Sequence, residues 1–269
     1  MGQKRGARLG QHFLKAKWAA RSLAYAVGIR NGDTVLEIGP GKGALTRELL
    51  ALAKENGARV VAIEKDAALV VSLNEIFRDE IDSGLLTVHE GDIRDADPKE
   101  LGFESGRYLV AANIPYYITG EIIRQFLTAE AQPRAMALLV QKEVAKRIIS
   151  DKESLLSLSV KAYGVPKIVM KVPRGNFSPP PNVDSAILLV ENISRDFFAT
   201  IDEELFFKVL HAGFKSKRKF LLSNLAGTFE KEGVTRAFEQ CGINVKARAE
   251  DVSLDAWRCL ATQLVAFSS

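Results

Sequence analysis

Between residues 34 and 141 the sequence alternates short β-rich runs with segments of helical periodicity, a pattern that few folds accept. Strand-like runs are expected at residues 34–39, 59–64, 85–90, 108–113 and 136–141. Helices are expected between them, at residues 44–56, 67–78 and 120–128. Strands that alternate with helices form a mainly parallel sheet with helices on both faces. The alternation therefore predicts an α/β fold.

The regions that flank this alternation indicate how the fold is completed. A helix is expected at residues 16–28, and residues 157–172 and 184–190 have the pattern of a final antiparallel pair, which brings the predicted sheet to seven strands. From about residue 195 only helical spacing of apolar residues remains, at residues 203–214, 216–226, 234–241 and 254–265. We therefore predict a domain over residues 1–194 and a small all-α domain over residues 195–269.

Basic residues are concentrated in three stretches of a chain whose net charge is only +4. Residues 1–21 and 154–183 contain lysines and arginines and no acidic residue, and a third group lies at residues 215–219. One such run is usually an ordinary solvated face, but three together favour a nucleic acid as partner. The residues that we expect to contact it are Lys4, Arg5, Arg8, Lys215, Lys217, Arg218 and Lys219.

The sequence disfavours several classes of protein. Its two cysteines, Cys241 and Cys259, match no metal or redox motif, and so few thiols are typical of a reducing compartment. Three scattered histidines predict no metal site. No apolar stretch approaches membrane-spanning length, and the basic N-terminus lacks the apolar core of a signal peptide. We therefore expect a cytoplasmic protein with no membrane partner, and a monomer by default.

A glycine-rich turn predicts a cofactor site. In residues 34–44 a strand runs into Gly39 and Gly41 and then into a helix, and such glycines permit positive φ and close approach of a ligand. An acidic residue, Glu64, ends the next strand and can accept hydrogen bonds from ribose hydroxyls. Gly39-x-Gly41-x-x-Ala44 also satisfies the relaxed dinucleotide fingerprint, so a nicotinamide cofactor is an alternative.

The ends of the next two strands favour S-adenosylmethionine over a nicotinamide. Asp92 ends the third strand, where it can bind an adenine amino group, and Asn113 ends the fourth. The carboxyl ends of parallel strands meet at the edge where open sheets bind ligands. The series Glu37, Gly39, Glu64, Asp92 and Asn113 is therefore expected to line one crevice.

The tetrapeptide Asn113-Ile114-Pro115-Tyr116 has the residues needed to hold the exocyclic amine of a flat base beside a methyl donor. The amide oxygen of Asn113 can accept a hydrogen bond from that amine. Pro115 fixes φ and has no N–H, so the carbonyl of Ile114 can be aimed at the same amine. Tyr116 offers a ring on which a flipped-out base can stack. A strand and turn with structural aromatics is the alternative interpretation.

The order of these motifs resembles that of the ribosomal RNA adenine dimethyltransferases of the KsgA family. Gly10-Gln-His-Phe-Leu14 is similar to the family's N-terminal Gly-Gln-Asn-Phe-Leu, Glu37–Gly41 to its cofactor turn, and Asn113–Ile118 to its catalytic motif. Residues 140–148, 177–185 and 248–254 also resemble family segments. The resemblance covers nearly the whole chain and implies a Rossmann-like class I methyltransferase fold with a C-terminal RNA-binding domain.

The resemblance also implies an activity and its site. The family uses S-adenosylmethionine to dimethylate N6 of two adjacent adenosines in the 3′-terminal hairpin of small-subunit (16S) rRNA within an immature 30S subunit. Phe177 and Tyr116 would sandwich the target adenine. His12 departs from the family's usual Asn, and its charge would depend on pH. The residues that would contact the cofactor are His12, Leu14, Gly39, Gly41, Glu64, Asp92 and Asn113.

Three other functions share parts of this pattern. The related family that methylates large-subunit (23S) rRNA in macrolide resistance would use the same chemistry, but the motifs at residues 10–14, 141–145 and 248–251 favour the small-subunit family. A non-catalytic RNA-binding or ribosome-assembly factor would not require Asn113, Pro115, Tyr116 and Glu64, so the presence of these residues argues against a loss of catalysis. A nicotinamide oxidoreductase would need an acid–base residue, and the motif region offers no candidate.

Overall fold

The computed structural model describes residues 12–265 and divides into two compact units. The first unit contains the chain up to residue 146 together with residues 164–193. The second unit contains residues 147–163 and the chain from residue 194 onward. Residues 147–163, which the sequence analysis placed with the first domain, thus belong to the helical unit.

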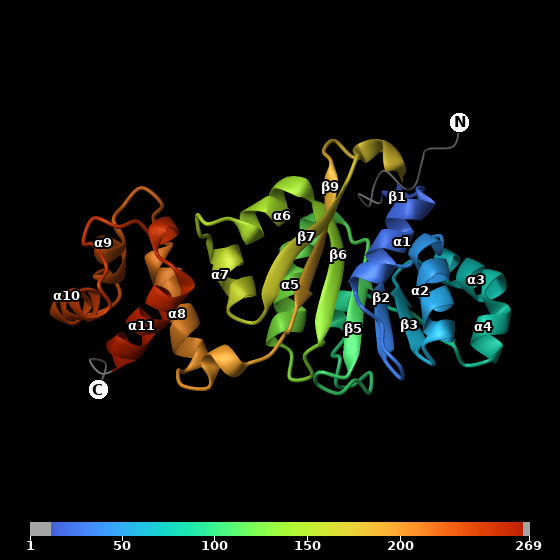
Figure 1. Cartoon of the computed structure of the whole chain (residues 1–269), viewed down its shortest axis with the longest axis horizontal. Coiled ribbons are helices and arrows are strands. Elements are labelled where there is room, and N and C mark those ends of the chain that lie inside the picture. Colours follow the sequence, from blue (N-terminus) through green and yellow to red (C-terminus); the bar gives the residue numbers. More distant parts are fainter. Residues whose placement is uncertain (1–11, 266–269) are drawn as a thin grey trace. The chain divides into compact units, whose positions relative to one another are not determined.

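The first unit is built on a mixed seven-stranded sheet in the order β4-β3-β2-β5-β6-β9-β7 (Figure 1). The first five strands in this order are parallel, and β9 pairs antiparallel with both β6 and β7. The predicted α/β class and the mainly parallel sheet are confirmed. The strands are β2 (Thr34–Ile38), β3 (Arg59–Glu64), β4 (Leu86–Glu90), β5 (Tyr108–Ala112), β6 (Ala135–Gln141), β7 (Val165–Val172) and β9 (Ser185–Glu191).

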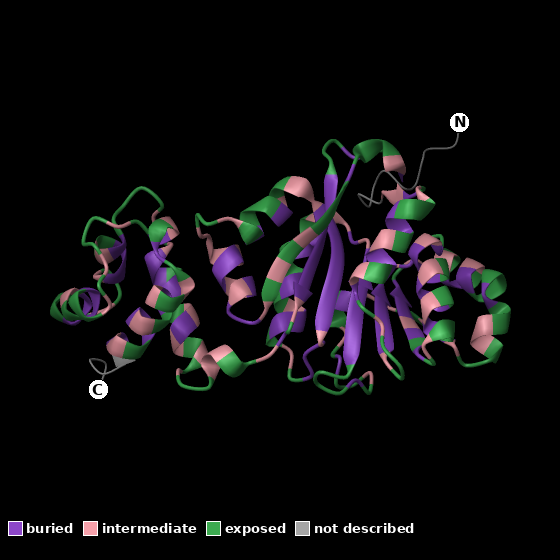
Figure 2. Cartoon of the chain, viewed as in Figure 1, coloured by how far each residue is buried: buried purple, intermediate pink, exposed green. Residues whose placement is uncertain are grey.

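The central strands are buried throughout and mainly apolar, because helices cover the sheet. Every residue of β2 and β5 is buried, as expected for parallel strands that are covered on both faces (Figure 2). The amphipathic helices contribute Leu23, Leu49 and Leu73 to the same core. The helices of this unit are α1 (Lys17–Ala26), α2 (Ala44–Glu55), α3 (Ala67–Ile76), α4 (Arg78–Asp82) and α5 (Thr119–Thr128), and α6 (Lys142–Ile149) crosses its boundary at residue 146.

The strand predicted at residues 157–172 is wrong over its first part. Helix α7 (Leu155–Lys161) occupies that part, and β7 begins only at Val165. Ser154 starts the helix because it forms a capping box with Ser157, in which each side-chain oxygen accepts a hydrogen bond from the other residue's main-chain N–H. The helix buries Leu158 and Val160, two residues whose alternation with polar neighbours also suits a strand.

The second unit consists of helices around a single apolar core. Its largest buried side chains, Phe206, Phe238 and Trp257, pack with Leu158 of α7. The predicted helix at residues 216–226 is wrong over its first half, because residues 215–219 offer no apolar side chain to this core and form a turn instead. The remaining helices are α8 (Glu203–Gly213), α9 (Leu221–Leu225), α10 (Lys231–Gln240) and α11 (Leu254–Val265).

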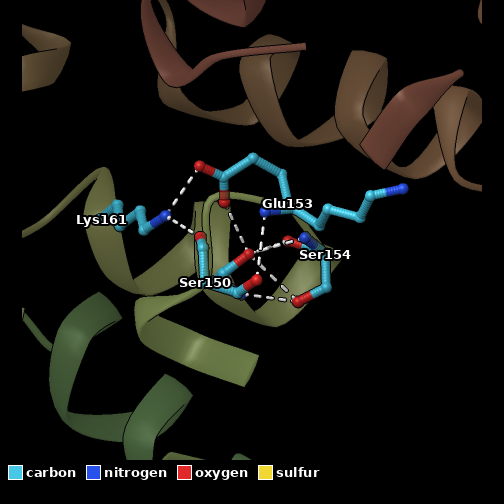
Figure 3. Close-up of polar contacts among 6 residues, drawn as sticks. Ser150, Glu153, Ser154 and Lys161 are labelled. Carbon is cyan, nitrogen blue, oxygen red and sulfur yellow. Dashed lines mark hydrogen bonds and ion pairs between the residues drawn. The ribbon is translucent and has the colours of Figure 1, made fainter. Parts of the chain in front are cut away.

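A polar network holds the loop before α7 in place (Figure 3). Lys161 Nζ donates to Glu153 Oε1 over 2.7 Å and to the carbonyl oxygen of Ser150 over 2.8 Å. Ser157 Oγ donates to Glu153 Oε2 over 2.7 Å. The N–H of Glu153 donates to the carbonyl oxygen of Glu250 over 2.8 Å. The loop before α7 is therefore tied to residues 248–254, one of the segments on which the resemblance to the family rests.

The two cysteines form a disulfide, whereas the sequence analysis took them as thiols typical of a reducing compartment. Cys241 follows α10 and Cys259 lies in α11, and their Cα atoms are 5.8 Å apart. The pairing could not be predicted from the sequence, in which the two cysteines are 18 residues apart. The sulfurs come together only when α10 and α11 pack against each other. Among the described helices, none is long and apolar enough to cross a membrane.

Candidate active site

A cavity of about 320 Å³ lies at the carboxyl ends of β2, β3, β4 and β5. The short strand β1 (Phe13–Leu14) contributes to its wall. The crevice predicted from the ends of four strands is thus present in the fold. The predicted site residues that line it are His12, Leu14, Gly39, Gly41, Glu64, Asp92, Asn113, Ile114, Pro115 and Tyr116, and Glu37 lines it as well.

The glycine turn after β2 is packed too closely to accept side chains. Gly41 has φ +59°, and a Cβ atom there would lie 3.1 Å from the ring of Phe13. Gly43 has φ +77°, and a Cβ atom there would lie 2.6 Å from the ring of Phe77. Both positions therefore require glycine, for conformation and for space. The turn brings main-chain N–H groups to the start of α2, beside the cavity.

Glu64 ties this glycine turn to the end of β3. Its side chain is 4% exposed. Oε2 accepts a hydrogen bond from the N–H of Gly41 over 2.9 Å, and Oε1 accepts one from the N–H of Asp66 over 3.0 Å. Each carboxylate oxygen has a second lone pair. Glu64 can therefore hold the turn and accept ribose hydroxyls at the same time.

Glu37, at the end of β2, is a second buried carboxyl group of the cavity wall. Its side chain is 1% exposed. Burial raises the pKa of Glu37 to about 8, and the negative charge of Glu64 raises it as well. At neutral pH the site therefore has two carboxyl groups in different environments, one held by main-chain N–H groups and one that favours the protonated form.

Asp92 lies just beyond β4 between two cations. Lys65 Nζ is 2.7 Å and Arg94 Nη2 is 2.6 Å from Asp92 Oδ2. The hydrogen bond from Arg94 lowers the pKa of Asp92 well below its usual range, with a further lowering from Lys65. Asp92 is therefore ionised at all physiological pH values.

The side-chain amide of Asn113 is fixed by the N-terminal segment. Asn113 Nδ2 donates to the carbonyl oxygen of His12 over 3.2 Å. His12 is itself held by a hydrogen bond between Nδ1 and the carbonyl oxygen of Pro179, over 2.8 Å. Because Nδ2 faces His12, the Oδ1 atom of Asn113 is free to face the cavity as an acceptor.

The aromatic residues of the site lie in two different environments. Tyr116 lines the cavity, stacks on the His12 ring at a centroid distance of 5.8 Å, and shares a 2.7 Å hydrogen bond with Ser185 Oγ. Phe177 is 1% exposed and packs in the core of the sheet unit, outside the cavity wall. It belongs to the short strand β8 (Phe177–Ser178), which pairs with β1. Stacking of a base on Phe177 stays a prediction.

The basic residues expected to bind nucleic acid are only partly described. Lys215, Lys217, Arg218 and Lys219 are exposed in the turn between α8 and α9. In the stretch at residues 154–183, Lys161 pairs with Glu153 and Lys167 with Glu191, so part of its charge is neutralised. Lys4, Arg5 and Arg8 lie outside the described residues.

Sequence reasoning missed several residues of the site. Lys65 and Arg94 bind Asp92, and Ser185 binds Tyr116 from a strand far along the chain. The cations next to Asp92 could have been found from their positions, because Lys65 follows Glu64 and Arg94 follows Asp92 by two residues. Ser185 carries no such local signal. The described residues contain no cluster of metal-ligating side chains.

The sheet order and the cavity at the strand ends define the class of S-adenosylmethionine-dependent methyltransferases. The residues fit this cofactor, because the buried Glu64 carboxylate can accept from a ribose, and Gly39, where an added Cβ would meet no atom within 4 Å, leaves room for a close approach. The sequence matches the family described as Ribosomal RNA adenine dimethylase over residues 2–264. The chain belongs to this family.

Relatives of the chain have closely related names. Ribosomal RNA small subunit methyltransferase A of Dehalococcoides mccartyi is 40% identical over 256 residues, which cover 94% of this chain and 86% of the relative. The protein of the same name from Geobacillus thermodenitrificans is 36% identical, over 96% of this chain and 90% of the relative.

Two solved structures have a similar fold over nearly the whole chain. A dimethyladenosine transferase from Plasmodium falciparum is 25% identical, with a TM-score of 0.76 over 93% of this chain and 96% of that one. The 23S rRNA methyltransferase ErmE is also 25% identical, with a TM-score of 0.75 over 94% of this chain and 99% of that one. This chain therefore shares its fold with both proteins over nearly its whole length.

Proposed function

We propose that this chain uses S-adenosylmethionine to dimethylate N6 of two adjacent adenosines in the 3′-terminal hairpin of small-subunit (16S) rRNA. The observation that carries the proposal is the orientation of Asn113. Its amide nitrogen is engaged by His12, and its oxygen is left for an amine in a cavity that it shares with Glu64 and Asp92.

Each end of the cavity suits one part of the cofactor. We assign the ribose hydroxyls to Glu64 and the adenine amino group to Asp92, because both are acceptors that line the wall. His12, Leu14 and the turn containing Gly39 and Gly41 would surround the methionyl end. Asn113 would then separate the cofactor from the target base.

The chain's own groups would activate a weak nucleophile. When bound, S-adenosylmethionine supplies a sulfonium methyl group, and adenine N6 gains this methyl as the carbon–sulfur bond breaks and a proton leaves N6 for water. Asn113 Oδ1 and the Ile114 carbonyl would accept hydrogen bonds from N6, which favours a tetrahedral amine and stabilises its developing positive charge. Pro115 keeps the Ile114 carbonyl aimed at the amine.

The aromatic residues would hold the flipped adenine. Tyr116 lines the cavity, and its hydroxyl is anchored to Ser185, so its ring can form a fixed platform. Phe177 would complete the sandwich only if β8 moved relative to its present buried position. The structure therefore favours Tyr116 as the principal stacking residue.

The partner would be rRNA within an immature 30S subunit, bound by a monomer in the cytoplasm. The exposed cations Lys215, Lys217, Arg218 and Lys219 would contact phosphates and fix the register of the RNA without reading its bases. All four side chains are exposed in one turn, which suits contact with the backbone of a structured RNA that is recognised by shape. Lys4, Arg5 and Arg8 are proposed to act in the same way.

Large-subunit rRNA is the second candidate substrate. The observation in its favour is the fold shared with ErmE, a 23S rRNA methyltransferase. The identity of 25% to that protein is lower than the 40% to a protein named Ribosomal RNA small subunit methyltransferase A. The small subunit is therefore the preferred substrate.

The decisive experiment is methyl transfer from radiolabelled S-adenosylmethionine to small subunits that lack the modification, with large subunits in parallel. Label recovered as dimethyladenosine in small-subunit RNA, and lost in Asn113→Ala, would support the proposal. Label on large-subunit RNA alone would show that large-subunit rRNA, and not small-subunit rRNA, is the substrate. No label on either, with cofactor still bound, would indicate a non-catalytic assembly factor.

A further inference from the structure

The carboxylate of Asp92 has no acceptor position left for an additional donor. Lys65 Nζ donates to Oδ2 over 2.7 Å, and Arg94 Nη2 donates to the same atom over 2.6 Å. Arg94 Nε lies 3.1 Å from Oδ1, which also accepts from the main-chain N–H of Arg94 over 3.1 Å. An ionised carboxylate offers about four acceptor positions. Lys65 Nζ, two nitrogens of the Arg94 side chain and the Arg94 main-chain N–H fill them. The side chains of Lys65, Asp92 and Arg94 are here named the Asp92 clamp.

We propose that Arg94 is a gate at the adenine end of the cofactor site, which must release Asp92 before the cofactor's amino group can bind there. The inference rests on the proposed function, in which Asp92 accepts a hydrogen bond from that amino group. Binding then exchanges a hydrogen bond between two opposite charges for one in which only the carboxylate is charged, and the first has the additional attraction of the guanidinium charge. The Arg94–Asp92 pair therefore lowers the affinity for the cofactor and makes that affinity depend on the purine's amino group.

The main chain around Arg94 is fixed, so only its side chain has to move. Gln125 of α5 donates through Nε2 to the carbonyl oxygens of Ile93 and Ala96, over 2.8 and 2.9 Å. Ile93 is buried beneath the same turn. The Arg94 side chain is 38% exposed, and a rotation about its own bonds is enough to carry the guanidinium into solvent.

The released guanidinium has a second acidic partner nearby. The negative charge of Glu121, in the first turn of α5, raises the pKa of Arg94 in addition to the larger effect of Asp92. Glu121 can therefore stabilise Arg94 after it leaves Asp92.

The two cations of the clamp are not equivalent. Arg94 contacts both oxygens of Asp92, whereas Lys65 contacts Oδ2 alone and its side chain is 65% exposed. Removal of Arg94 frees acceptor positions on both oxygens, and removal of Lys65 frees one position on one oxygen. Arg94 is therefore the main barrier to the amino group.

The test is calorimetric titration of the full chain with S-adenosylhomocysteine and with S-inosylhomocysteine, in which a carbonyl oxygen replaces the purine amino group. The variants are Arg94→Ala, Lys65→Ala and Arg107→Ala. Arg107 is the matched control, because it is an exposed arginine just before β5. It therefore lies at the amino end of a strand whose carboxyl end faces the cavity.

For S-adenosylhomocysteine we expect Arg94→Ala to lower the Kd roughly three- to tenfold, with a smaller decrease in Lys65→Ala and none in Arg107→Ala. For S-inosylhomocysteine we expect no gain in any variant, because its oxygen cannot donate to Asp92. A general loosening of the turn would change both ligands equally, so the comparison separates the gate from a structural role.

Each other result would overturn a defined part of the proposal. Equal or weaker binding of S-adenosylhomocysteine by Arg94→Ala would overturn the gate alone, and weaker binding would assign Arg94 to direct contact with the cofactor. An equal gain for both ligands would also overturn it. If the wild-type chain does not bind S-adenosylhomocysteine, the proposed cofactor site fails, and the gate fails with it.

Discussion

Asn113 Nδ2 donates a hydrogen bond to the main-chain carbonyl oxygen of His12 over 3.2 Å, across 101 residues of sequence. This contact fixes the direction of a side chain that stands at the centre of the proposed chemistry. Because the acceptor is a main-chain carbonyl oxygen, the hydrogen bond does not depend on which side chain stands at position 12. The chain can therefore have His12 where its family usually has Asn and still orient Asn113.

Asn113 gives the first prediction. Asn113→Ala removes the acceptor for the target amine, and we expect methyl transfer to fall by about 10²–10³-fold. In Asn113→Asp an acceptor oxygen remains, but a carboxylate oxygen would face the carbonyl of His12 and turn the group away. We expect Asn113→Asp to be nearly as inactive as Asn113→Ala when methyl transfer is measured in a single turnover. Wild-type rates in Asn113→Asp would show that the contact with His12 has no role.

Glu64 gives a prediction about cofactor affinity and stability together. In Glu64→Gln one of two N–H groups, that of Gly41 in a buried hydrogen bond or that of Asp66 in a part-buried one, would face an NH2 group instead of an acceptor. A buried donor left without a partner costs about 1–3 kcal/mol. We therefore expect a lower melting temperature and weaker binding of S-adenosylhomocysteine. Glu90→Gln is the control, because Glu90 is exposed and lies beside Glu64 in the strand register.

Glu37 gives a prediction about pH. Its pKa is raised from the model-compound value of 4.5 to about 8, chiefly by burial, so the folded state binds a proton that the unfolded state has released. This contribution to stability is complete below pH 4.5 and is lost as the pH rises to about 8. The slope is at most ~1.4 kcal/mol per pH unit.

The measurement for Glu37 is urea unfolding of the wild type and of Glu37→Gln at several pH values. Glutamine keeps the shape of a protonated carboxyl group and does not titrate. We expect the wild type to lose stability relative to Glu37→Gln as the pH rises from 5 to 8. A difference that does not change with pH would contradict the raised pKa.

The disulfide between Cys241 and Cys259 predicts a redox-dependent stability of the helical unit. It closes a loop with a sequence separation of 18 residues. We expect reduction to destabilise the chain by about 2–4 kcal/mol, seen as a lower unfolding temperature with reductant. The paired variant Cys241→Ser with Cys259→Ser should show no such response. Wild-type melting that does not respond to reductant would argue against the bond.

Sequence reasoning succeeded where structure follows from neighbouring residues. The turn after Thr34–Ile38 could be predicted because its glycines and its apolar strand are adjacent. The crevice could be predicted because parallel strands place Glu64, Asp92 and Asn113 at one edge by topology alone. Sequence analysis also placed β3 at Arg59–Glu64, where the structure has it.

Other features depend on contacts between distant residues and could not be predicted. Strands β1 and β8 are two residues long and exist only because they pair with each other. The burial of Phe177 follows from that pairing. The alternation of apolar and polar residues at 157–160 fits a strand and a helix equally, and the capping box of Ser154 decides between them. The Cys241–Cys259 pairing requires two helices to be packed.

The division of the chain into units has a consequence for how such a protein can diverge. Residues 147–163 supply Leu158 and Ala162 to the core of the helical unit, and the chain then returns to the sheet before it continues into α8. A single genetic recombination near residue 194 would therefore join helices α8–α11 of one relative to the core segment 147–163 of another. Exchange of the whole helical unit between relatives needs three breakpoints, one on each side of residues 147–163 and one near residue 194, so the two units are expected to share one evolutionary history.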